Sequence, residues 1–583
     1  MVSSQSPRPS VRRELRQAAL ILGVLLVLEL VAWLPKASAA SLVSGDPVAS
    51  PRVFDGNGDG VRDKTVLTFR LQSRTPVTVR ILDYRKAFVR TLIGGTTLAA
   101  GSHTISWNGR LATGAVVPDG GYRFRLTVGS STAAVTFDRK ITKSPNVIFA
   151  ANPGALTVAI DAGHGGPDPG AVRDGYTEAS ANLDIALRTR AMLEGAGVTI
   201  VGTRSTNTRV NTSNTDFNHD GKVDKADELA SRIDIANRAR AAAFLCIHNN
   251  SGSSTTARGT ETFYWQYRTF AAESKQLATL VQSSVVRRLN TAGSFRTVDR
   301  GTKSYDFYVL NGYDPARRVN PSLMPGVLSE GLFVSNTTDR TMLKTARGRA
   351  RLAEGYYDGL ARYFAGRTYG AAYRLDTPPS ATLAEGSAAS LSVTVTNTSP
   401  RSWTAGSVAL TLSALPRVED YDGTNATGST LATIDLPALA VGRSVAVDVP
   451  FVVPDDAGFL ATAGKALFKV DLIAGGQRYA SHGVVPLPIP VTISGDSGTP
   501  PDPTPTPTPT EAPSPTPTPD PTPTEAPSQS PAPSADGASV DMSPPPTTPS
   551  PSLDPTSPPT PTATPTPDPT LDPAASETPL ASP

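Results

Sequence analysis

Hydrophobic and polar residues alternate in the first part of the chain after residue 40. In one predicted strand Leu67, Phe69 and Leu71 fall on one face, and polar residues stand between them. A period of two between Gly-rich turns is typical of β-strands with one buried face. We therefore predict an all-β sandwich over residues 41–150.

The pattern changes after residue 150. Short apolar runs, TVAID, VTIVGT and FLCIH, now alternate with longer segments suited to helices at 178–194 and 227–242. This alternation predicts an α/β domain with a mainly parallel sheet, which we assign to residues 151–368. Because ligands of such sheets bind at the carboxyl ends of the strands, we expect the chemistry of the chain in this domain.

Strand-like alternation returns between residues 369 and 495. Leu391, Val393 and Val395 share one face, and this predicts a second β-sandwich. From residue 496 onward the chain repeats Pro-Thr, Pro-Ser and Pro-Asp and holds more than half of the 54 prolines. Such a segment cannot bury a core, so we predict a disordered tail over 496–583.

The first 40 residues carry a targeting pattern. Arginines precede an apolar run at 18–34, and small residues follow it at 37–40. This order predicts an export signal, with an uncleaved membrane anchor as the alternative. Glu29 inside the run and the A-x-A pattern after it favour cleavage.

Charge and cysteine content add two limits. The formal net charge is +3, and no Lys or Arg occurs from residue 496 onward, so an acidic tail follows a basic body. A basic body suits any anionic polymer, but the sequence has no nucleic-acid-binding motif, and we predict no nucleic-acid partner. Because Cys246 is the only cysteine, stability comes from cores and bound metal rather than from intramolecular disulfides.

Two of the five histidines stand at the ends of apolar runs: His164 follows TVAIDAG, and His248 ends FLCIH. Glu178 opens a predicted helix after a short loop. Two histidines and one carboxylate are a usual ligand set of catalytic zinc, which leaves a fourth position for water. The alternatives are histidines that are merely satisfied at a core edge, and a glutamate that only interacts with the helix dipole. The helical zinc-peptidase motif HExxH is absent from the sequence.

A series of segments resembles, in order and spacing, the catalytic domain of zinc-dependent N-acetylmuramoyl-L-alanine amidases. The segments are AIDAGHGGPDPGA, YTEASANLDIALRTRAML, VTIVGTR, SRIDIANRARAAAFLCIHNN, GTETFYW and VLSEGLFVSN, within residues 156–366. The resemblance implies that His164, Glu178 and His248 are zinc ligands. It also implies that Glu330 is the catalytic carboxylate.

The resemblance implies an exported hydrolase that cleaves the amide bond between N-acetylmuramic acid and L-alanine of peptidoglycan, in remodelling or lysis of the cell wall. Zinc lowers the pKa of its bound water toward about 7, and Glu330 would pass the proton of that water to the departing nitrogen. The alternatives are another zinc amidohydrolase or peptidase acting on wall peptides, and an inactive wall-binding scaffold. Other wall polymers are candidate partners of the β-domains, and the oligomeric state is open.

Three positions near the candidate ligands qualify this picture. The family usually has proline where Ala162 stands, which changes a loop and not a ligand. Asp161 and Asn249 have two interpretations of equal weight: they orient the histidines, or they satisfy backbone groups of the loops.

The N-terminal β-domain has a resemblance of its own. Its segments NGDG, VRTL, AGSHTISWNGR and VPDGGYRFRL resemble the immunoglobulin-like domain of flagellar hook-capping proteins, which also occurs in many exported enzymes. Domains of this kind usually serve as spacers or surface binders. We extend the immunoglobulin-like prediction to the second β-sandwich.

A second metal is predicted from the segment DFNHDGKVDKAD, which matches the spacing of an EF-hand calcium loop with Gly221 at position 6. The candidate ligands are Asp216, Asn218, Asp220, Lys222, Asp224 and Asp227. The alternative is an exposed acidic loop without metal. A similar segment, DGNGDGVRD at 55–63, has no acidic residue at position 12, so there we predict a plain turn.

Overall fold

The structure is a computed structural model that describes residues 42–130, 134–146, 153–311, 321–415, 428–454 and 465–494. The predicted export segment and the predicted Pro-rich tail lie outside these ranges. Within them, no helix combines the length and the apolar character needed to cross a membrane.

The N-terminal region is built only from strands. Two sheets form, with the orders β1-β3-β6 and β2-β8-β7-β4-β5. Leu67, Phe69 and Leu71 are buried in one hydrophobic core together with residues of the second sheet such as Val79 and Phe124. The apolar residues that alternate in the sequence are thus the buried residues of these strands. The strands are β1 (Val48–Ser50), β2 (Val53–Phe54), β3 (Thr65–Leu71), β4 (Thr75–Asp83), β5 (Phe88–Leu98), β6 (Gly101–Trp107), β7 (Gly120–Val128) and β8 (Val135–Lys143).

The central region contains a six-stranded sheet of order β12-β9-β13-β16-β14-β15. Every neighbouring pair is parallel except β14 with β16. A mainly parallel sheet, as predicted, therefore holds the central region together. The strands are β9 (Thr157–Ala162), β12 (Thr199–Gly202), β13 (Phe244–His248), β14 (Thr260–Tyr264), β15 (Asp299–Ser304) and β16 (Gly326–Glu330), with a separate hairpin of β10 (Val172–Arg173) and β11 (Tyr176–Thr177).

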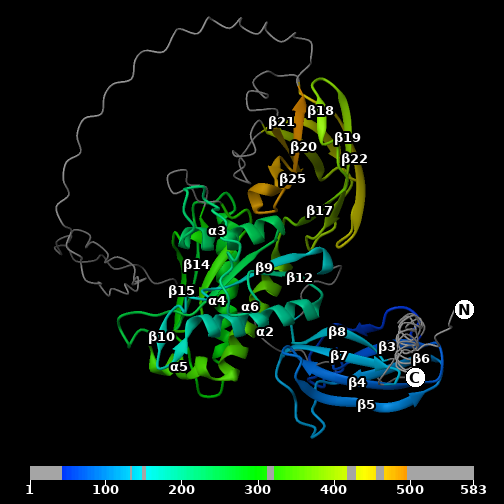
Figure 1. Ribbon diagram of the computed structural model, residues 1–583, viewed down its shortest axis with the longest axis vertical. Coiled ribbons are helices and arrows are strands. Elements are labelled where there is room, and N and C mark those ends of the chain that lie inside the picture. Colours follow the sequence, from blue (N-terminus) through cyan, green and yellow to red (C-terminus); the bar gives the residue numbers. More distant parts are fainter. Residues whose placement is uncertain are drawn as a thin grey trace, which may run out of the picture. The chain divides into compact units, whose positions relative to one another are not determined.

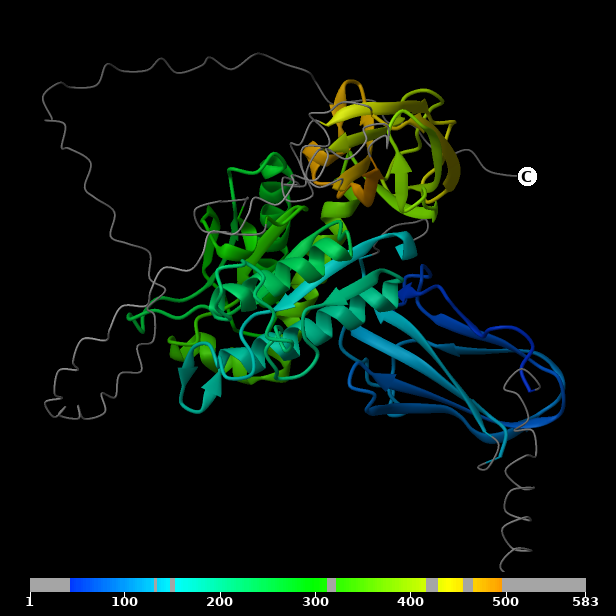
Figure 2. The ribbon, with the colours of Figure 1, turned by 45° about the horizontal axis from the view of Figure 1, so that its top comes forward.

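Helices cover both faces of this sheet. The helices are α2 (Glu178–Ala196), α3 (Lys225–Arg238), α4 (Ala271–Leu289), α5 (Thr337–Lys344) and α6 (Ala346–Gly366). Val158 and Ile160 of β9 share a core with α2, α4 and α6, whereas Ala159 between them packs in the core that includes α3. Figures 1 and 2 show α2, α4 and α6 side by side. Because helices bury both faces of the sheet, its central strands are continuous apolar runs in the sequence.

A second all-β region follows. One sheet has the order β17-β19-β22, and the other has the order β18-β25-β23-β20-β21, with β24 paired to β23. Leu391, Val393 and Val395 of β19 are buried in its core, as their alternation predicted. The immunoglobulin-like assignment of this region stays a prediction. The strands are β17 (Ala371–Thr377), β18 (Thr382–Ala384), β19 (Ala388–Asn397), β20 (Ala409–Leu415), β21 (Ser429–Asp435), β22 (Ser444–Val452), β23 (Lys465–Ala474), β24 (Gln477–Arg478) and β25 (Leu487–Ser494).

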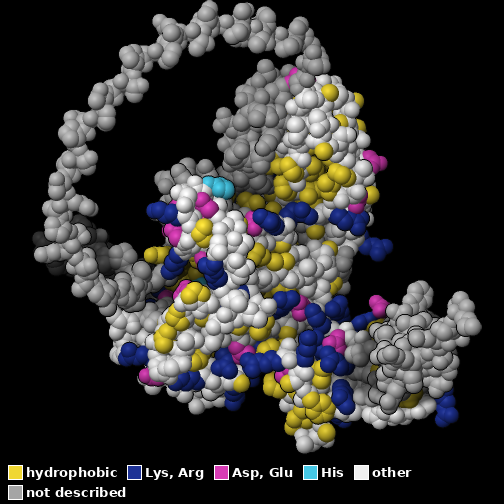
Figure 3. Space-filling view, viewed as in Figure 1, with side chains coloured by type: hydrophobic (Ala, Val, Ile, Leu, Met, Phe, Trp, Pro, Cys, Tyr) yellow, Lys and Arg dark blue, Asp and Glu magenta, His cyan; other side chains and the backbone are white. Residues whose placement is uncertain are grey.

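The charged side chains on the face shown in Figure 3 are mixed in sign. Lys and Arg are spread over this face, and Asp and Glu lie among them. The charge on this face therefore does not indicate a particular anionic partner.

Candidate metal centre

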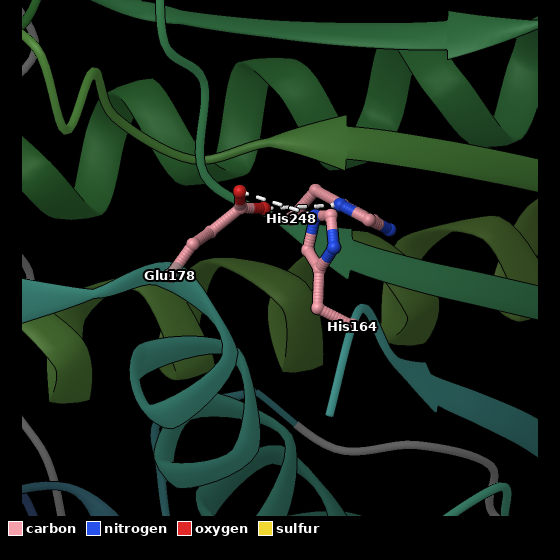
Figure 4. Close-up of side chains that lie close together, drawn as sticks. All are labelled: His164, Glu178 and His248. Atoms are coloured by element: carbon pink, nitrogen blue, oxygen red, sulfur yellow. Dashed lines mark hydrogen bonds and ion pairs between the residues drawn. The ribbon is translucent and has the colours of Figure 1, made fainter. Parts of the chain in front are cut away.

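The three candidate zinc ligands meet at the carboxyl ends of the parallel strands. His164 follows β9, His248 ends β13 and Glu178 is the first residue of α2. One ligand atom from each lies within 4.8 Å of those from the other two. His164 Nε2 is 3.1 Å from Glu178 Oε2, and His248 Nδ1 is 3.0 Å from Glu178 Oε1. Figure 4 shows the glutamate reaching both imidazoles.

Glycines make this close approach sterically feasible. A Cβ atom at Gly163 would overlap the His248 imidazole. A Cβ atom at Gly170 would lie 2.7 Å from Glu178 Oε2. His164 itself adopts φ 60°, a conformation that few non-glycine residues take. The Gly-rich segment after β9 thus leaves room for the two rings and the carboxylate.

Hydrogen bonds orient the candidate ligands. His164 Nδ1 donates to Asp168 Oδ2 at 2.8 Å, which leaves Nε2 facing Glu178. Glu178 Oε1 accepts from the Asn182 side chain and from the Asn249 backbone amide, both at 3.1 Å. Asp168 and Asn182 were not assigned roles in the sequence. The position of Asp168, in the Gly-rich segment after His164, was the signal that could have identified it.

The electrostatics favour a positive charge between these groups. Burial lowers the pKa of His164, but Glu178 and Asp168 outweigh it and raise that pKa to about 10. Burial also opposes ionisation of Glu178, yet His164 and His248 hold its pKa well below the usual range. A cluster that stabilises a bound proton in this way also suits a bound cation.

The donor set fits a zinc ion. Zinc takes imidazole nitrogen and carboxylate oxygen ligands at about 2.0–2.2 Å, so two ligands of a tetrahedral ion lie roughly 3.3–3.6 Å apart. The observed separations of 3.0 and 3.1 Å are close to that range. Three protein ligands also leave a fourth coordination position for water.

Glu330 ends β16, directly beside His248 in the parallel ladder. It is 8% exposed, and among the described residues its Oε2 is buried without a hydrogen-bond partner. Burial, with a further contribution from Glu178, raises the pKa of Glu330 well above its usual range. A buried carboxyl group with an unpaired oxygen is suited to exchange a proton with a bound reactant.

Neither Asp161 nor Asn249 hydrogen-bonds a histidine through its side chain in the described part of the chain. Asp161 Oδ1 accepts from Thr203 and from Arg232 at 2.6 and 2.7 Å. The Asn249 side chain donates to Asn182 at 2.7 Å. The two residues therefore support the strand ends around the site rather than the imidazoles.

Two arginines, which no sequence pattern singled out, hold the loop after β9. Arg204 donates to the carbonyls of Ala162, Gly163 and Ala179 at 2.7 to 2.9 Å. Arg232 donates to the carbonyl of His164 at 3.1 Å. Both arginines come from segments distant in the sequence, so only the folded chain brings them to the loop.

We expect Arg232→Ala to lower the free energy of unfolding by about 3–5 kcal/mol, because it leaves the buried Asp161 carboxylate without its charge partner. The side chains of this pair are 3% and 2% exposed. Arg238→Ala is the matched control on α3, since Arg232 and Arg238 each pair with an acidic residue four positions earlier. The Arg238 side chain is 77% exposed, so its loss should cost less than about 1 kcal/mol. Urea unfolding of both variants checks this, and equal losses would contradict it.

The candidate calcium loop lies before α3. Asp216 accepts backbone amide hydrogen bonds from Asp220 and Gly221. Asp224 and Asp227 form a capping box at the start of α3. In this part of the described chain, no three carboxylates have oxygen atoms within 4.8 Å of one another. The structure thus brings together the zinc candidates but not the carboxylates of this loop.

Comparison with known families gives two matches. A family described as N-acetylmuramoyl-L-alanine amidase matches residues 158–362. A family described as FlgD Ig-like domain matches residues 57–132. The two matches confirm the resemblances of the central region and of the N-terminal β-region.

Two amidases of Bacillus subtilis (strain 168) agree with the first match. N-acetylmuramoyl-L-alanine amidase LytC of Bacillus subtilis (strain 168) is 32% identical over 278 residues, which cover 47% of this chain and 48% of that protein. The chain thus spans about half the length of this relative. The sporulation-specific N-acetylmuramoyl-L-alanine amidase of the same organism is 32% identical over 211 residues, 36% of this chain and 68% of that protein. Among solved structures, the catalytic domain of the amidase CwlV from Bacillus (Paenibacillus) polymyxa var. colistinus matches with 27% identity, 36% coverage of this chain, 97% coverage of that chain and a TM-score of 0.28.

Proposed function

Because the chain belongs to the N-acetylmuramoyl-L-alanine amidase family, we propose that it hydrolyses the amide bond between N-acetylmuramic acid and L-alanine in peptidoglycan. The observation that carries this proposal is the cluster of His164, Glu178 and His248, with Glu330 on the neighbouring strand. A cluster of this kind lies where parallel sheets bind their ligands.

We propose zinc as the metal of this centre. His164 would hold it through Nε2, because Nδ1 is engaged with Asp168. His248 would bind through Nδ1, and Glu178 through a carboxylate oxygen. When bound, zinc polarises the scissile carbonyl and makes its water a nucleophile near neutral pH.

Glu330 is the proposed proton carrier. It accepts the proton of the attacking water and donates it to the nitrogen of the departing L-alanine. Its buried, unpaired oxygen supports this role, because burial raises the pKa of this carboxyl group and so strengthens its hold on a proton that it takes up from water. Asn182 and the Asn249 amide keep Glu178 in place while the reaction proceeds.

We propose a secreted or cell-wall location, because the substrate lies outside the cytoplasmic membrane. We also propose calcium at the loop of residues 216–227, supported by its EF-hand spacing. Calcium binding there would require Asp224 and Asp227 to turn from the cap of α3 toward the ion.

The purified chain, incubated with peptidoglycan, should release stem peptides that begin with L-alanine. N-terminal labelling and mass spectrometry of the soluble products check this expectation. New reducing sugar ends without such peptides would indicate a glycan hydrolase. Cleavage between amino acids of the stem would favour the wall-peptidase alternative, and no release at all would favour the inactive scaffold.

A further inference from the structure

A second cluster of acidic side chains lies in the N-terminal region, on the loop between β2 and β3. One carboxylate oxygen each of Asp55, Asp59 and Asp63 lies within 4.8 Å of the others. The sequence predicted a plain turn here, because position 12 of the calcium-loop pattern is not acidic. The structure nevertheless brings together Asp55, Asp59 and Asp63, which stand at positions 1, 5 and 9 of that pattern.

Asp55 is the unusual member of the cluster. It is 9% exposed, and its Oδ1 is buried with no hydrogen-bond partner among the described residues. Its other oxygen lies 3.6 Å from a nitrogen of Arg62, a separation longer than a hydrogen bond. A buried carboxylate oxygen without a partner is costly, so this atom points to a ligand that would bind it.

The rest of the loop presents its oxygens in fixed positions. Asp63 accepts from the backbone amides of Gly58 and Gly60 at 2.5 and 2.7 Å. Asp59 Oδ1 accepts from the Val61 amide at 2.7 Å. Gly56, at φ 62°, approaches the end of β6 so closely that a Cβ atom would lie 2.7 Å from Asn108 O. The loop is therefore held against the sheet while its carboxylates face one another.

We propose that Asp55, Asp59 and Asp63 bind a calcium ion, with the side-chain oxygen of Asn57 as a further ligand. All four donors are oxygens, which hard cations prefer, whereas zinc and copper sites generally contain histidine or cysteine. Three carboxylates and the Arg62 guanidinium leave a local charge of about −2, which a divalent cation neutralises. Calcium suits such a loop better than magnesium, because it accepts irregular coordination without a shell of retained water.

This ion would join the end of β2 to the start of β3 and so stabilise the N-terminal region. The site uses none of the residues of the zinc centre. The inference is therefore independent of the proposed amidase activity.

Calcium counting on the full chain tests the proposal. The other candidate loop is first removed by Asp216→Asn and Asp220→Asn, and bound calcium is measured by equilibrium dialysis in buffer that contains zinc. We expect one calcium ion per chain in this background and none after Asp55→Asn and Asp59→Asn are added. These substitutions keep side-chain size. Asp63 is left intact because it accepts two backbone hydrogen bonds.

Asp46→Asn is the matched control, since this side chain lies in the same region and is 88% exposed. The control should keep its calcium. Equal calcium binding with and without the Asp55 and Asp59 substitutions would overturn the proposal.

A second measurement does not depend on how well the variants fold. In the background that retains Asp55, Asp59 and Asp63, calcium should raise the melting temperature, because a ligand that binds only the folded state stabilises it. The same concentration of magnesium should have a smaller effect. An unchanged melting temperature at millimolar calcium would contradict the site even if the Asp55 variant did not fold.

Discussion

Glu178→Ala should remove zinc from the protein and abolish peptidoglycan hydrolysis. Glu178 pairs with both other candidate ligands, through Oε2 to His164 and Oε1 to His248. Its removal leaves two imidazoles, fewer than the three protein ligands usual in a catalytic zinc site. The loss of activity should exceed the about 10²–10⁴-fold that a single proton-transferring group contributes. Elemental analysis of the purified variant and release of stem peptides measure the two effects.

Glu194→Ala is a matched control for this change. Glu194 lies near the other end of α2 and forms an ion pair with Arg190 four residues earlier, away from the metal centre. This variant should keep stoichiometric zinc and activity close to that of the unmodified chain. Stoichiometric zinc in Glu178→Ala itself would refute the ligand set.

The sequence predicted the positions of the candidate site residues that stand at the ends of strands or at the start of a helix. His164 and His248 could be placed at one edge of the sheet because each closes an apolar run, and parallel strands share that edge. Glu178 could be placed there because it begins a helix that packs on the same strands. Local hydrophobic patterns of this kind place a residue at the end of a strand or the start of a helix, and no long-range contact has to be known for that.

The hydrogen bonds and salt bridges that support the site could not be predicted from local patterns, because they join segments that are distant in the chain. Asp161 was a candidate partner of the histidines, but a salt bridge with Arg232, 71 residues away, occupies it. The contacts of Arg204 with the loop after β9 likewise span about 40 residues of chain. Such pairings depend on how α3 and the segment after β12 pack against the sheet, which hydrophobic periodicity does not specify.

The acidic loop at 55–63 shows a different limit of sequence patterns. The spacing favoured a plain turn over a calcium site, because position 12 has no carboxylate. Gly58 and Gly60 adopt positive φ angles of 90° and 89°, which let the chain fold back so that Asp63 meets Asp55. Asp55, Asp59 and Asp63 stand at positions 1, 5 and 9 of the calcium-loop spacing, so the group forms without an acidic residue at position 12.

Glu330→Gln should separate metal binding from catalysis. Glutamine cannot carry the proton, so we expect hydrolysis of peptidoglycan to fall by about 10²–10⁴-fold. Zinc should stay at one ion per chain, because Glu330 is not among the clustered ligands. Thermal stability should also be retained, since Oε2 of Glu330 has no hydrogen bond to lose in the described part of the chain. Zinc content, melting temperature and the rate of stem-peptide release are measured on the same preparation.

The combination of these three readouts distinguishes the proposed role from a structural one. A Glu330→Gln protein that loses zinc along with activity would make Glu330 a ligand or a support of the ligands rather than the proton carrier. A protein that keeps zinc and full activity would assign the proton transfer to another group. The proposed role predicts that turnover is lost while zinc and stability are retained. Hydrolysis is then the only property that depends on the proton carried by the Glu330 carboxyl group, and no other outcome matches a buried oxygen that interacts only with the reacting water.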